Sequence, residues 1–268
     1  MTQPTLVEPG RKVSLADFDP DYRGELKKKD PEVKRRRKEA IKRIYELQER
    51  LWAEGGQALL VVLQALDAGG KDGTIRHVMK GLNPQGVKVA GFKVPTDEEL
   101  GHDFLWRVHL QTPRKGQIGV FNRSHYEDVL VVRVKQLVPE HVWGRRYDDI
   151  NDFERLLHDS GTRVLKFYLH ISKDEQKGRL QKRLEDPTKH WKFSSGDLHE
   201  RVRWDEYMTA YEDALSRCST EHAPWHIIPA NRKWYRNLIV AETIRDTLEE
   251  MNPQWPAAKI DLSGVVIE

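Results

Sequence analysis

The stretch Leu59-Leu-Val-Val-Leu-Gln-Ala-Leu-Asp-Ala-Gly-Gly-Lys-Asp-Gly-Thr74 decides the fold of this chain. Its first half is an apolar run typical of a buried strand, and its second half is a glycine-rich turn, a lysine and a helix start. Such a turn points successive backbone N–H groups into one concavity, and the helix adds the positive end of its dipole. The stretch therefore predicts a loop that binds a phosphate chain, formed by Ala68, Gly69, Gly70, Lys71, Asp72, Gly73 and Thr74.

This loop departs from the phosphate-loop pattern G-x-x-x-x-G-K-[ST]. Ala65 stands where the first glycine is expected, Asp72 stands where a hydroxyl is expected, and the next hydroxyl is Thr74. Asp67, inside the loop, is either a turn-forming aspartate or a carboxylate beside phosphates, which needs a divalent cation or a proton between them. Lys71 is the strongest candidate for a catalytic cation that neutralises charge as a phosphoryl group moves.

The composition indicates one globular unit with a heavily charged surface. The chain has 268 residues, of which 38% are hydrophobic and 32% charged, and its net charge is +3. A chain of this length buries one substantial core. The single cysteine, Cys218, excludes an intramolecular disulfide. No apolar run approaches the roughly 20 residues that span a bilayer, and the N-terminus lacks the order of a secretion signal, so we expect a cytoplasmic protein.

Short apolar strands alternate with helices along the chain, which predicts a parallel sheet with helices on both faces. We expect an irregular arm over residues 1–20. The expected strands are 58–65, 87–92, 117–121, 163–170 and 225–228. The main expected helices are 31–54, 71–82, 139–160, 172–186, 198–216 and 231–251. Ligands of such sheets bind at the carboxyl ends of the strands, so the polar segments that follow the strands share one rim.

The segment Asn122-Arg-Ser-His-Tyr-Glu-Asp128 follows the third expected strand. Asn122 stands where many phosphate-loop enzymes place a second metal-binding acid, and Arg123 is suited to hold a phosphate through two hydrogen bonds. Glu127 and Asp128 are candidates for a metal ligand, a base or a contact to the phosphoryl acceptor. Locally, Ser124 followed by Glu127 also fits a capped helix start, which is compatible with those functions.

Two segments, 27–38 and 177–192, are densely basic. Each is either a solvated helix face or a surface that attracts a polyanion. The polar, poorly periodic stretch 186–197 suits a surface loop or a lid, and a cationic lid over a phosphate chain excludes water. Trp191 and Phe193 either pack the closed lid or anchor this loop to the core. The candidate lid cations are Arg179, Lys182, Arg183, Lys189, His190 and Lys192.

Several motifs together make the chain, from about residue 17 to 246, resemble the second polyphosphate kinase family, the polyphosphate:nucleotide phosphotransferases. They are Asp67-Ala-Gly-Gly-Lys-Asp-Gly-Thr74, Phe121-Asn-Arg-Ser-His-Tyr-Glu-Asp128, Asp186-Pro-Thr-Lys-His-Trp-Lys-Phe193, Trp204-Asp-Glu-Tyr207, Ala223-Pro-Trp225 and Asn231-Arg-Lys233. The resemblance implies a P-loop kinase with a thymidylate-kinase-like three-layer α/β/α sandwich, a five-stranded parallel sheet and a helical lid. It also implies bound Mg²⁺, with Mn²⁺ as the alternative.

The resemblance assigns roles to individual residues. It implies that Asp67 contacts the metal and that Lys71 and Arg123 bind phosphate, and Asn122 is our candidate for a second metal ligand. It implies that the lid holds cations over the chain, namely Arg183, Lys189 and Lys192. Many family members carry aspartate in place of Asn122 and asparagine in place of Glu127. The variant here resembles the subgroup that phosphorylates nucleoside mono- and diphosphates, and it leaves the second metal ligand open between Asn122 and Glu127.

We therefore expect a single-domain enzyme that transfers the terminal phosphoryl of polyphosphate to AMP and to ADP. Its predicted parts are an N-terminal arm and helix (1–54), a P-loop core (55–185 and 218–268) and a lid region (186–217). The alternatives are an ATP-dependent nucleoside monophosphate kinase of the same fold and a non-enzymatic polyanion-binding protein. The family suggests a homotetramer, with a dimer as the alternative, and no membrane or nucleic-acid partner.

Overall fold

A five-stranded sheet of parallel strands forms the centre of the computed structural model, which describes residues 6–193, 195–261 and 267. The strand order is β2-β3-β1-β4-β5, so the chain crosses over between neighbours. Every residue of β1 is buried, as expected for a central strand covered on both faces. The strands are β1 (Ala58–Gln64), β2 (Val87–Gly91), β3 (Ile118–Asn122), β4 (Thr162–His170) and β5 (Trp225–Pro229).

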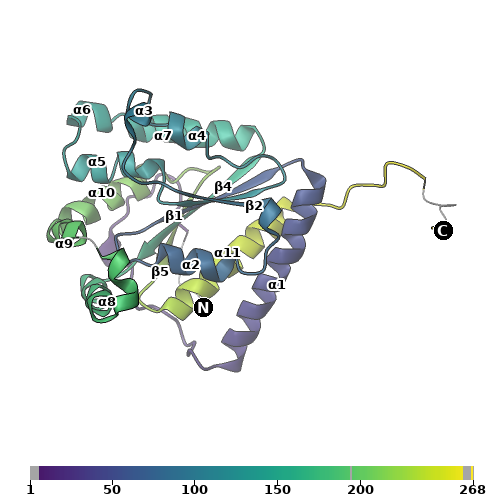
Figure 1. The fold of residues 1–268 in the computed structure, drawn as a ribbon, viewed down its shortest axis with the longest axis horizontal. Coiled ribbons are helices and arrows are strands. Elements are labelled where there is room, and N and C mark those ends of the chain that lie inside the picture. The colour runs from purple at the N-terminus through teal and green to yellow at the C-terminus, as the bar shows by residue number, and fades with distance from the viewer. Residues whose placement is uncertain (1–5, 194, 262–266, 268) are drawn as a thin grey trace.

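Helices cover both faces of the sheet, which confirms the three-layer α/β/α class (Figure 1). On one face lie α1 (Pro31–Glu54), α2 (Lys71–Val78) and α11 (Lys233–Met251). On the other lie α3 (Asp97–Leu100), α4 (Trp106–His109), α6 (Glu140–Trp143) and α7 (Arg146–Asp159). At one end are α5 (Val131–Val134), α8 (Lys173–Glu185), α9 (Ser195–Val202) and α10 (Trp204–Arg217). The 3₁₀ helices are η1 (Leu15–Asp17), η2 (Pro84–Gly86), η3 (His125–Asp128) and η4 (Pro187–Lys192).

The five predicted strands are confirmed to within one or two residues, but three predicted helices are wrong in extent. The predicted helix 71–82 ends four residues early, at Val78. The predicted helix 139–160 is interrupted after Trp143, where a Cβ on Gly144 would lie 2.8 Å from the carbonyl oxygen of Glu140. The predicted helix 198–216 is divided into α9 and α10 at Arg203, which leaves the helical region and serves as the N-cap of α10. The predicted loop 186–197 contains η4 and the start of α9.

The N-terminal arm is irregular, as predicted, but it is packed into the core along β5. The backbone N–H of Val7 donates to the carbonyl of Trp225 at 2.8 Å, and the hydroxyl of Ser219 donates to the carbonyl of Val7 at 2.5 Å. Val13 and Leu15 are buried as well. The arm therefore covers an edge strand that would otherwise expose unpaired backbone groups. Residues 1–5 of the predicted arm lie outside the described residues.

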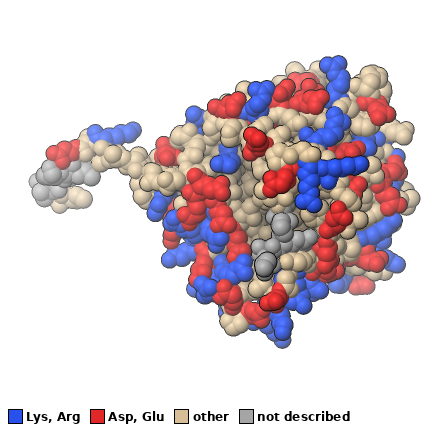
Figure 2. Space-filling view, turned by 180° about the vertical axis from the view of Figure 1, so that it is seen from behind, with Lys and Arg blue, Asp and Glu red and all other residues tan. Residues whose placement is uncertain are grey.

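The surface is charged with both signs interspersed. On the face shown in Figure 2, Lys and Arg side chains alternate with Asp and Glu side chains over most of the surface. Among the described helices, none has the combination of length and apolar character needed to cross a bilayer.

Candidate active site

The predicted phosphate loop connects β1 to α2 at the carboxyl end of the sheet. Two of its residues have left-handed backbone angles, Ala68 with φ of 61° and Gly70 with φ of 107°. A Cβ on Gly69 would lie 2.5 Å from the Cβ of Ala65, so only glycine fits there. The first N–H groups of α2 have no acceptor within the helix and point from its N-terminus. The loop therefore has the geometry of an anion-binding concavity.

Arg179 of α8 supports this loop from within the protein. It is buried, and its Nη1 donates to the carbonyls of Ala68 and Gly69, both at 2.9 Å. Its Nη2 donates to the carbonyls of Ala230 at 2.6 Å and Asn231 at 3.1 Å. These contacts satisfy backbone oxygens of the loop and fix its conformation. The expectation that Arg179 belongs to the lid is therefore wrong.

Two further side chains that the sequence does not single out also hold the loop. Arg236 of α11 is buried and lies so close to Gly70 that a Cβ there would be 1.9 Å from its Nη1. Burial and then the neighbouring Arg179 cation lower the pKa of Arg236 to about 10. Gln176 of α8 donates from Nε2 to the carbonyl of Asp67 at 3.0 Å. An arginine inside the apolar run of α11 is the one sequence signal that could have indicated this support.

Lys71, the first residue of α2, lies in the concavity with its side chain buried. Its Nζ donates to the carbonyl of Ala65 at 2.6 Å. Burial and then the Arg123 cation lower the pKa of Lys71, against the carboxylates of Asp67 and Glu127, and the resulting pKa is about 8. An anion in the loop would favour the protonated ammonium.

The predicted residues Asp67, Arg123 and Glu127 lie together at the rim. Nη2 of Arg123 donates to Oδ1 of Asp67 at 2.6 Å, and Nη1 lies 3.5 Å from Oε2 of Glu127. The Glu127 carboxylate, followed by that of Asp67, raises the pKa of Arg123, and burial lowers it by less. The pKa is therefore raised overall, and this guanidinium remains charged. Arg123 has φ of 65°, an uncommon angle for arginine that places its side chain between the two carboxylates.

A second cluster joins the loop to the predicted lid and to the end of β3. Oδ1 of Asp72 accepts from Nδ2 of Asn122 at 2.9 Å, and Oδ2 accepts from Nζ of Lys192 at 2.8 Å. The hydrogen bond from Lys192 lowers the pKa of Asp72, so this carboxylate is ionised at neutral pH. The predicted lid cation Lys192 thus contacts the phosphate loop directly.

Two other predicted residues, Asp128 and Lys189, pair with side chains outside these clusters. Asp128 accepts from Nη1 of Arg146 at 2.9 Å, and burial raises its pKa to about 6. Nζ of Lys189 pairs with Asp186 within η4, on the lid itself. Arg183 lies in the last turn of α8 and is partly buried.

Two tyrosines of α10 are further neighbours of the rim, for which the sequence predicted no role. Tyr211 is buried, and burial together with the Glu127 carboxylate raises its pKa. Burial, the Glu200 carboxylate and then Glu127 and Asp67 raise the pKa of Tyr207. Tyr207 is therefore the residue of the motif Trp204-Asp-Glu-Tyr207 that lies near the carboxylates of the rim. Its hydroxyl donates to Glu200.

The oxygen ligands available at the rim suit a magnesium ion that is completed by its substrate. Among the described residues, no three His, Cys, Asp or Glu side chains form a metal cage by themselves. Mg²⁺ is commonly held by one or two carboxylates, several waters and substrate phosphates. The carboxylate of Asp67 and the amide of Asn122 offer oxygen donors of the required kind.

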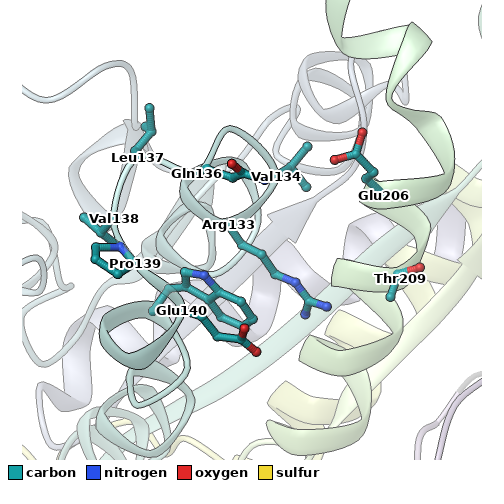
Figure 3. Close-up of a pocket in the computed structure, with 10 residues that line it drawn as sticks. Arg133, Val134, Gln136, Leu137, Val138, Pro139, Glu140, Glu206 and Thr209 are labelled. Atoms are coloured by element: carbon teal, nitrogen blue, oxygen red, sulfur yellow. The ribbon is translucent and has the colours of Figure 1, made fainter.

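A pocket of about 670 Å³ lies elsewhere, between the α5–α6 connection and α10. In Figure 3, Glu206 and Thr209 face Arg133, Leu137 and Val138 across this hollow. None of the predicted site residues, all of which are in the described part of the chain, lines it. The predicted chemistry therefore lies at the rim of the sheet and not in this pocket.

A parallel sheet with a lysine-bearing glycine loop after its central strand, and cations around that loop, defines a P-loop phosphotransferase. A family model described as Polyphosphate kinase 2 matches residues 26–256, and the chain belongs to that family.

Individual relatives agree with this assignment. The chain is 56% identical to an AMP/ADP-polyphosphate phosphotransferase of Meiothermus ruber, over 93% of this chain and 97% of the relative. It is 45% identical to an ADP-polyphosphate phosphotransferase of Rhodopseudomonas palustris, over 95% and 92% of the two chains. The crystal structure of polyphosphate kinase 2 from Arthrobacter aurescens TC1 superimposes with a TM-score of 0.91 at 47% identity, over 97% of this chain and 92% of that chain.

Proposed function

We propose that this enzyme transfers the terminal phosphoryl group of inorganic polyphosphate to AMP, giving ADP, and to ADP, giving ATP. The observation that carries the proposal is the convergence of Lys71, Arg123 and Lys192 around the carboxylates of the loop. The printed activity of the Meiothermus ruber relative, AMP/ADP-polyphosphate phosphotransferase, supports both acceptors. Two features favour polyphosphate over ATP as donor. Asp72 stands where the phosphate-loop pattern has a hydroxyl residue, and the proposed lid is rich in cations.

In this proposal the terminal phosphate lies at the loop, in line with the acceptor phosphate. Lys71 and Arg123 bind the transferred phosphoryl group and neutralise its charge. Lys192 breaks its ion pair with Asp72 and binds the polyphosphate chain instead. The attacking phosphate oxygen is already ionised, so positioning and charge neutralisation supply most of the catalysis. The reaction is reversible because one phosphoanhydride is exchanged for another.

Mg²⁺, or Mn²⁺ in its place, would be held by Asp67 and Asn122, with Glu127 as the alternative second ligand. When bound, the ion neutralises phosphate charge and orients the donor. Its charge would offset the repulsion between the Asp67 carboxylate and the phosphates.

The test is to incubate AMP with polyphosphate and Mg²⁺ in the absence of ATP. We expect ADP to form, and ADP as the acceptor to give ATP. An enzyme that forms ADP only when ATP is added is instead an ATP-dependent nucleoside monophosphate kinase. Salt-sensitive binding of polyphosphate without turnover indicates a polyanion-binding protein.

We further propose the division into core and lid, a cytoplasmic location and assembly into a homotetramer or dimer. Within the described chain, α1 packs along α11, where Arg36 pairs with Glu242 and Arg43 with Glu249. The outward side of α1 is therefore the part of that helix left for a partner. Sedimentation analysis distinguishes the assemblies.

A further inference from the structure

A charged pair lies inside the core, between β4 and α7. Lys166 and Glu154 are fully buried, and Nζ of Lys166 lies 2.5 Å from Oε2 of Glu154. Nζ also donates to the hydroxyl of Tyr126 at 2.7 Å and to the carbonyl of Cys218 at 2.6 Å, which uses all three ammonium protons. Oε1 of Glu154 accepts from the Tyr126 hydroxyl at 2.9 Å and lies 3.1 Å from Nε2 of His125. The pair is the centre of an extended hydrogen-bonded network.

Stability alone does not account for these buried charges. Desolvating two ions is costly, and replacing such a pair with apolar residues of similar volume often leaves a protein equally or more stable. A hydrogen-bonded network does supply fixed directions, which apolar packing does not. The side chains that this pair orients, His125 and Tyr126, belong to η3, the turn that carries Glu127.

Three consecutive buried residues of this turn lie between the candidate catalytic side chains of Arg123 and Glu127. The three residues between Arg123 and Glu127 are fully buried, and each has a side chain hydrogen-bonded inside the core. Ser124 accepts from Nε2 of Gln64 at 3.1 Å, which ties the turn to β1. The left-handed φ of Arg123 is unfavourable for arginine and persists because its surroundings hold it.

The same ammonium also reaches α10. The Cys218 carbonyl that accepts from Lys166 directly follows α10, the helix whose Tyr207 and Tyr211 neighbour Glu127. Lys166 therefore joins the two elements that lie beside the Glu127 carboxylate.

We propose that Lys166, Glu154 and Tyr126 form a positioning network that holds Arg123 and Glu127 in place beside the transferred phosphoryl group. This inference rests on the proposed function. The network has no contact with the rim itself and acts through η3. Because a misplacement of about 1 Å can cost roughly 100-fold in rate, the network affects kcat. Lys71 and Lys192 lie on other elements and still bind the donor, so a displacement of Arg123 lowers kcat and leaves KM for polyphosphate nearly unchanged.

Two double variants separate the charges from the hydrogen bonds. Glu154→Gln with Lys166→Met removes both charges but keeps an oxygen acceptor for the Tyr126 hydroxyl. Glu154→Leu with Lys166→Met removes the acceptor as well. We expect the Gln pair to keep kcat within about threefold, and the Leu pair to lose roughly tenfold or more, with KM for polyphosphate nearly unchanged in both. Unchanged kcat in a folded Leu pair overturns the proposal.

A single substitution decides the matter if the Leu pair fails to fold. Tyr126→Phe removes one hydroxyl from the network, and Tyr147→Phe is the matched control, a buried tyrosine whose hydroxyl accepts from Arg133 at 3.1 Å. We expect kcat to fall several-fold in the first and to stay within about twofold in the second, at temperatures well below both melting transitions. Equal kcat values in the two variants overturn the proposal.

The unchanged protein distinguishes failure of this inference from failure of the proposed function. If it forms no ADP from AMP and polyphosphate, the proposed function is wrong. The network is then tested by hydrogen exchange at the amides of η3. Exchange should accelerate in Tyr126→Phe and not in Tyr147→Phe, and equal exchange in the two contradicts the network.

Discussion

The phosphate loop and the proposed lid each carry a candidate phosphate-binding lysine, but they are held in opposite ways. The loop is fixed from inside by the buried side chains of Arg179, Arg236 and Gln176. In the lid, Lys189 pairs with Asp186 on the same turn, and Lys192 reaches the loop through one exposed carboxylate, Asp72. Support from the core prepares the loop for its ligand, whereas the described contact of Lys192 with the loop is an ion pair to the exposed carboxylate of Asp72.

This difference predicts which measurement responds to each region. Groups fixed before the reaction stabilise the transition state without reorganisation, so the loop should affect kcat and stability. A segment that closes over a bound chain should affect KM more than kcat, because its contacts form as the substrate binds.

The largest expected effect is at Lys71. Replacing Lys71 with Ala removes the cation nearest the transferred phosphoryl group, and we expect kcat to fall roughly 10²–10³-fold or more. The fold should remain intact, as circular dichroism can verify. Turnover close to that of the unchanged enzyme contradicts the assignment of Lys71.

Arg179→Met should weaken the loop through its support. The carbonyls of Ala68, Ala230 and Asn231 lose their side-chain donor, whereas that of Gly69 keeps Arg236. At about 1–3 kcal/mol for each unsatisfied group, the free energy of unfolding should fall by roughly 3 kcal/mol or more. Urea denaturation measures this change. Lys182→Met, at an exposed position of the same helix, is the control and should change stability little. If the two variants have the same free energy of unfolding, Arg179 does not support the loop from the core as described.

Lys192→Met should act mainly on donor binding. A hydrogen bond to a charged group contributes about 1.5–3 kcal/mol, so KM for polyphosphate should rise roughly tenfold while kcat changes less. Lys189→Met, in the same lid, should leave KM within about twofold, because Lys189 is engaged by Asp186. Steady-state kinetics with one polyphosphate preparation compares them, and a larger effect at Lys189 would reverse their roles.

The smallest expected effect is proton linkage at Lys71. Its pKa of about 8 means that the free enzyme loses this proton above pH 8, whereas bound phosphate favours the ammonium. Polyphosphate binding at pH 8.5 should therefore take up a proton, and affinity should fall a few-fold as pH rises through 8. Calorimetry in two buffers of different ionisation enthalpy measures the uptake, which should vanish in Lys71→Met.

The same shift affects folding with a defined sign. The unfolded chain keeps the Lys71 proton up to its ordinary pKa near 10.5, so between pH about 8 and 10.5 the unfolded state binds more protons. The contribution of this group to stability therefore rises with pH in that window. The lowered pKa is contradicted if, between pH about 8 and 10.5, the free energy of unfolding of the unchanged protein falls relative to that of Lys71→Met.

The sequence predicts the sheet well because its strands are continuous apolar runs bounded by turn residues. The helix Pro31–Glu54 is predicted to the residue, since Pro31 and Gly55 are strong start and stop signals. Breaks after Trp143 and at Arg203 were missed, because amphipathic periodicity continues across them and tertiary packing decides where a helix is interrupted.

The candidate site is predictable only where side chains act through local motifs. Asp67, Lys71, Arg123 and Glu127 lie in segments that directly follow β1 and β3, so the rule for parallel sheets brings them together. Arg179 and Arg236 lie on other helices and could not be distinguished by residue type from solvated cations. Their burial depends on which faces of α8 and α11 meet the loop, which one sequence does not specify.

The ion pairs of the rim also imply a form of selectivity. Asp67 holds Arg123 and Asp72 holds Lys192, so the protein's own carboxylates occupy cations intended for phosphate. Any incoming anion has to compete with these covalently attached carboxylates, which are always present at high local concentration. A weak monovalent anion gains too little to displace them, whereas a polyanion replaces several at once. The internal pairs should therefore protect the site from common small anions and admit a ligand of high charge density.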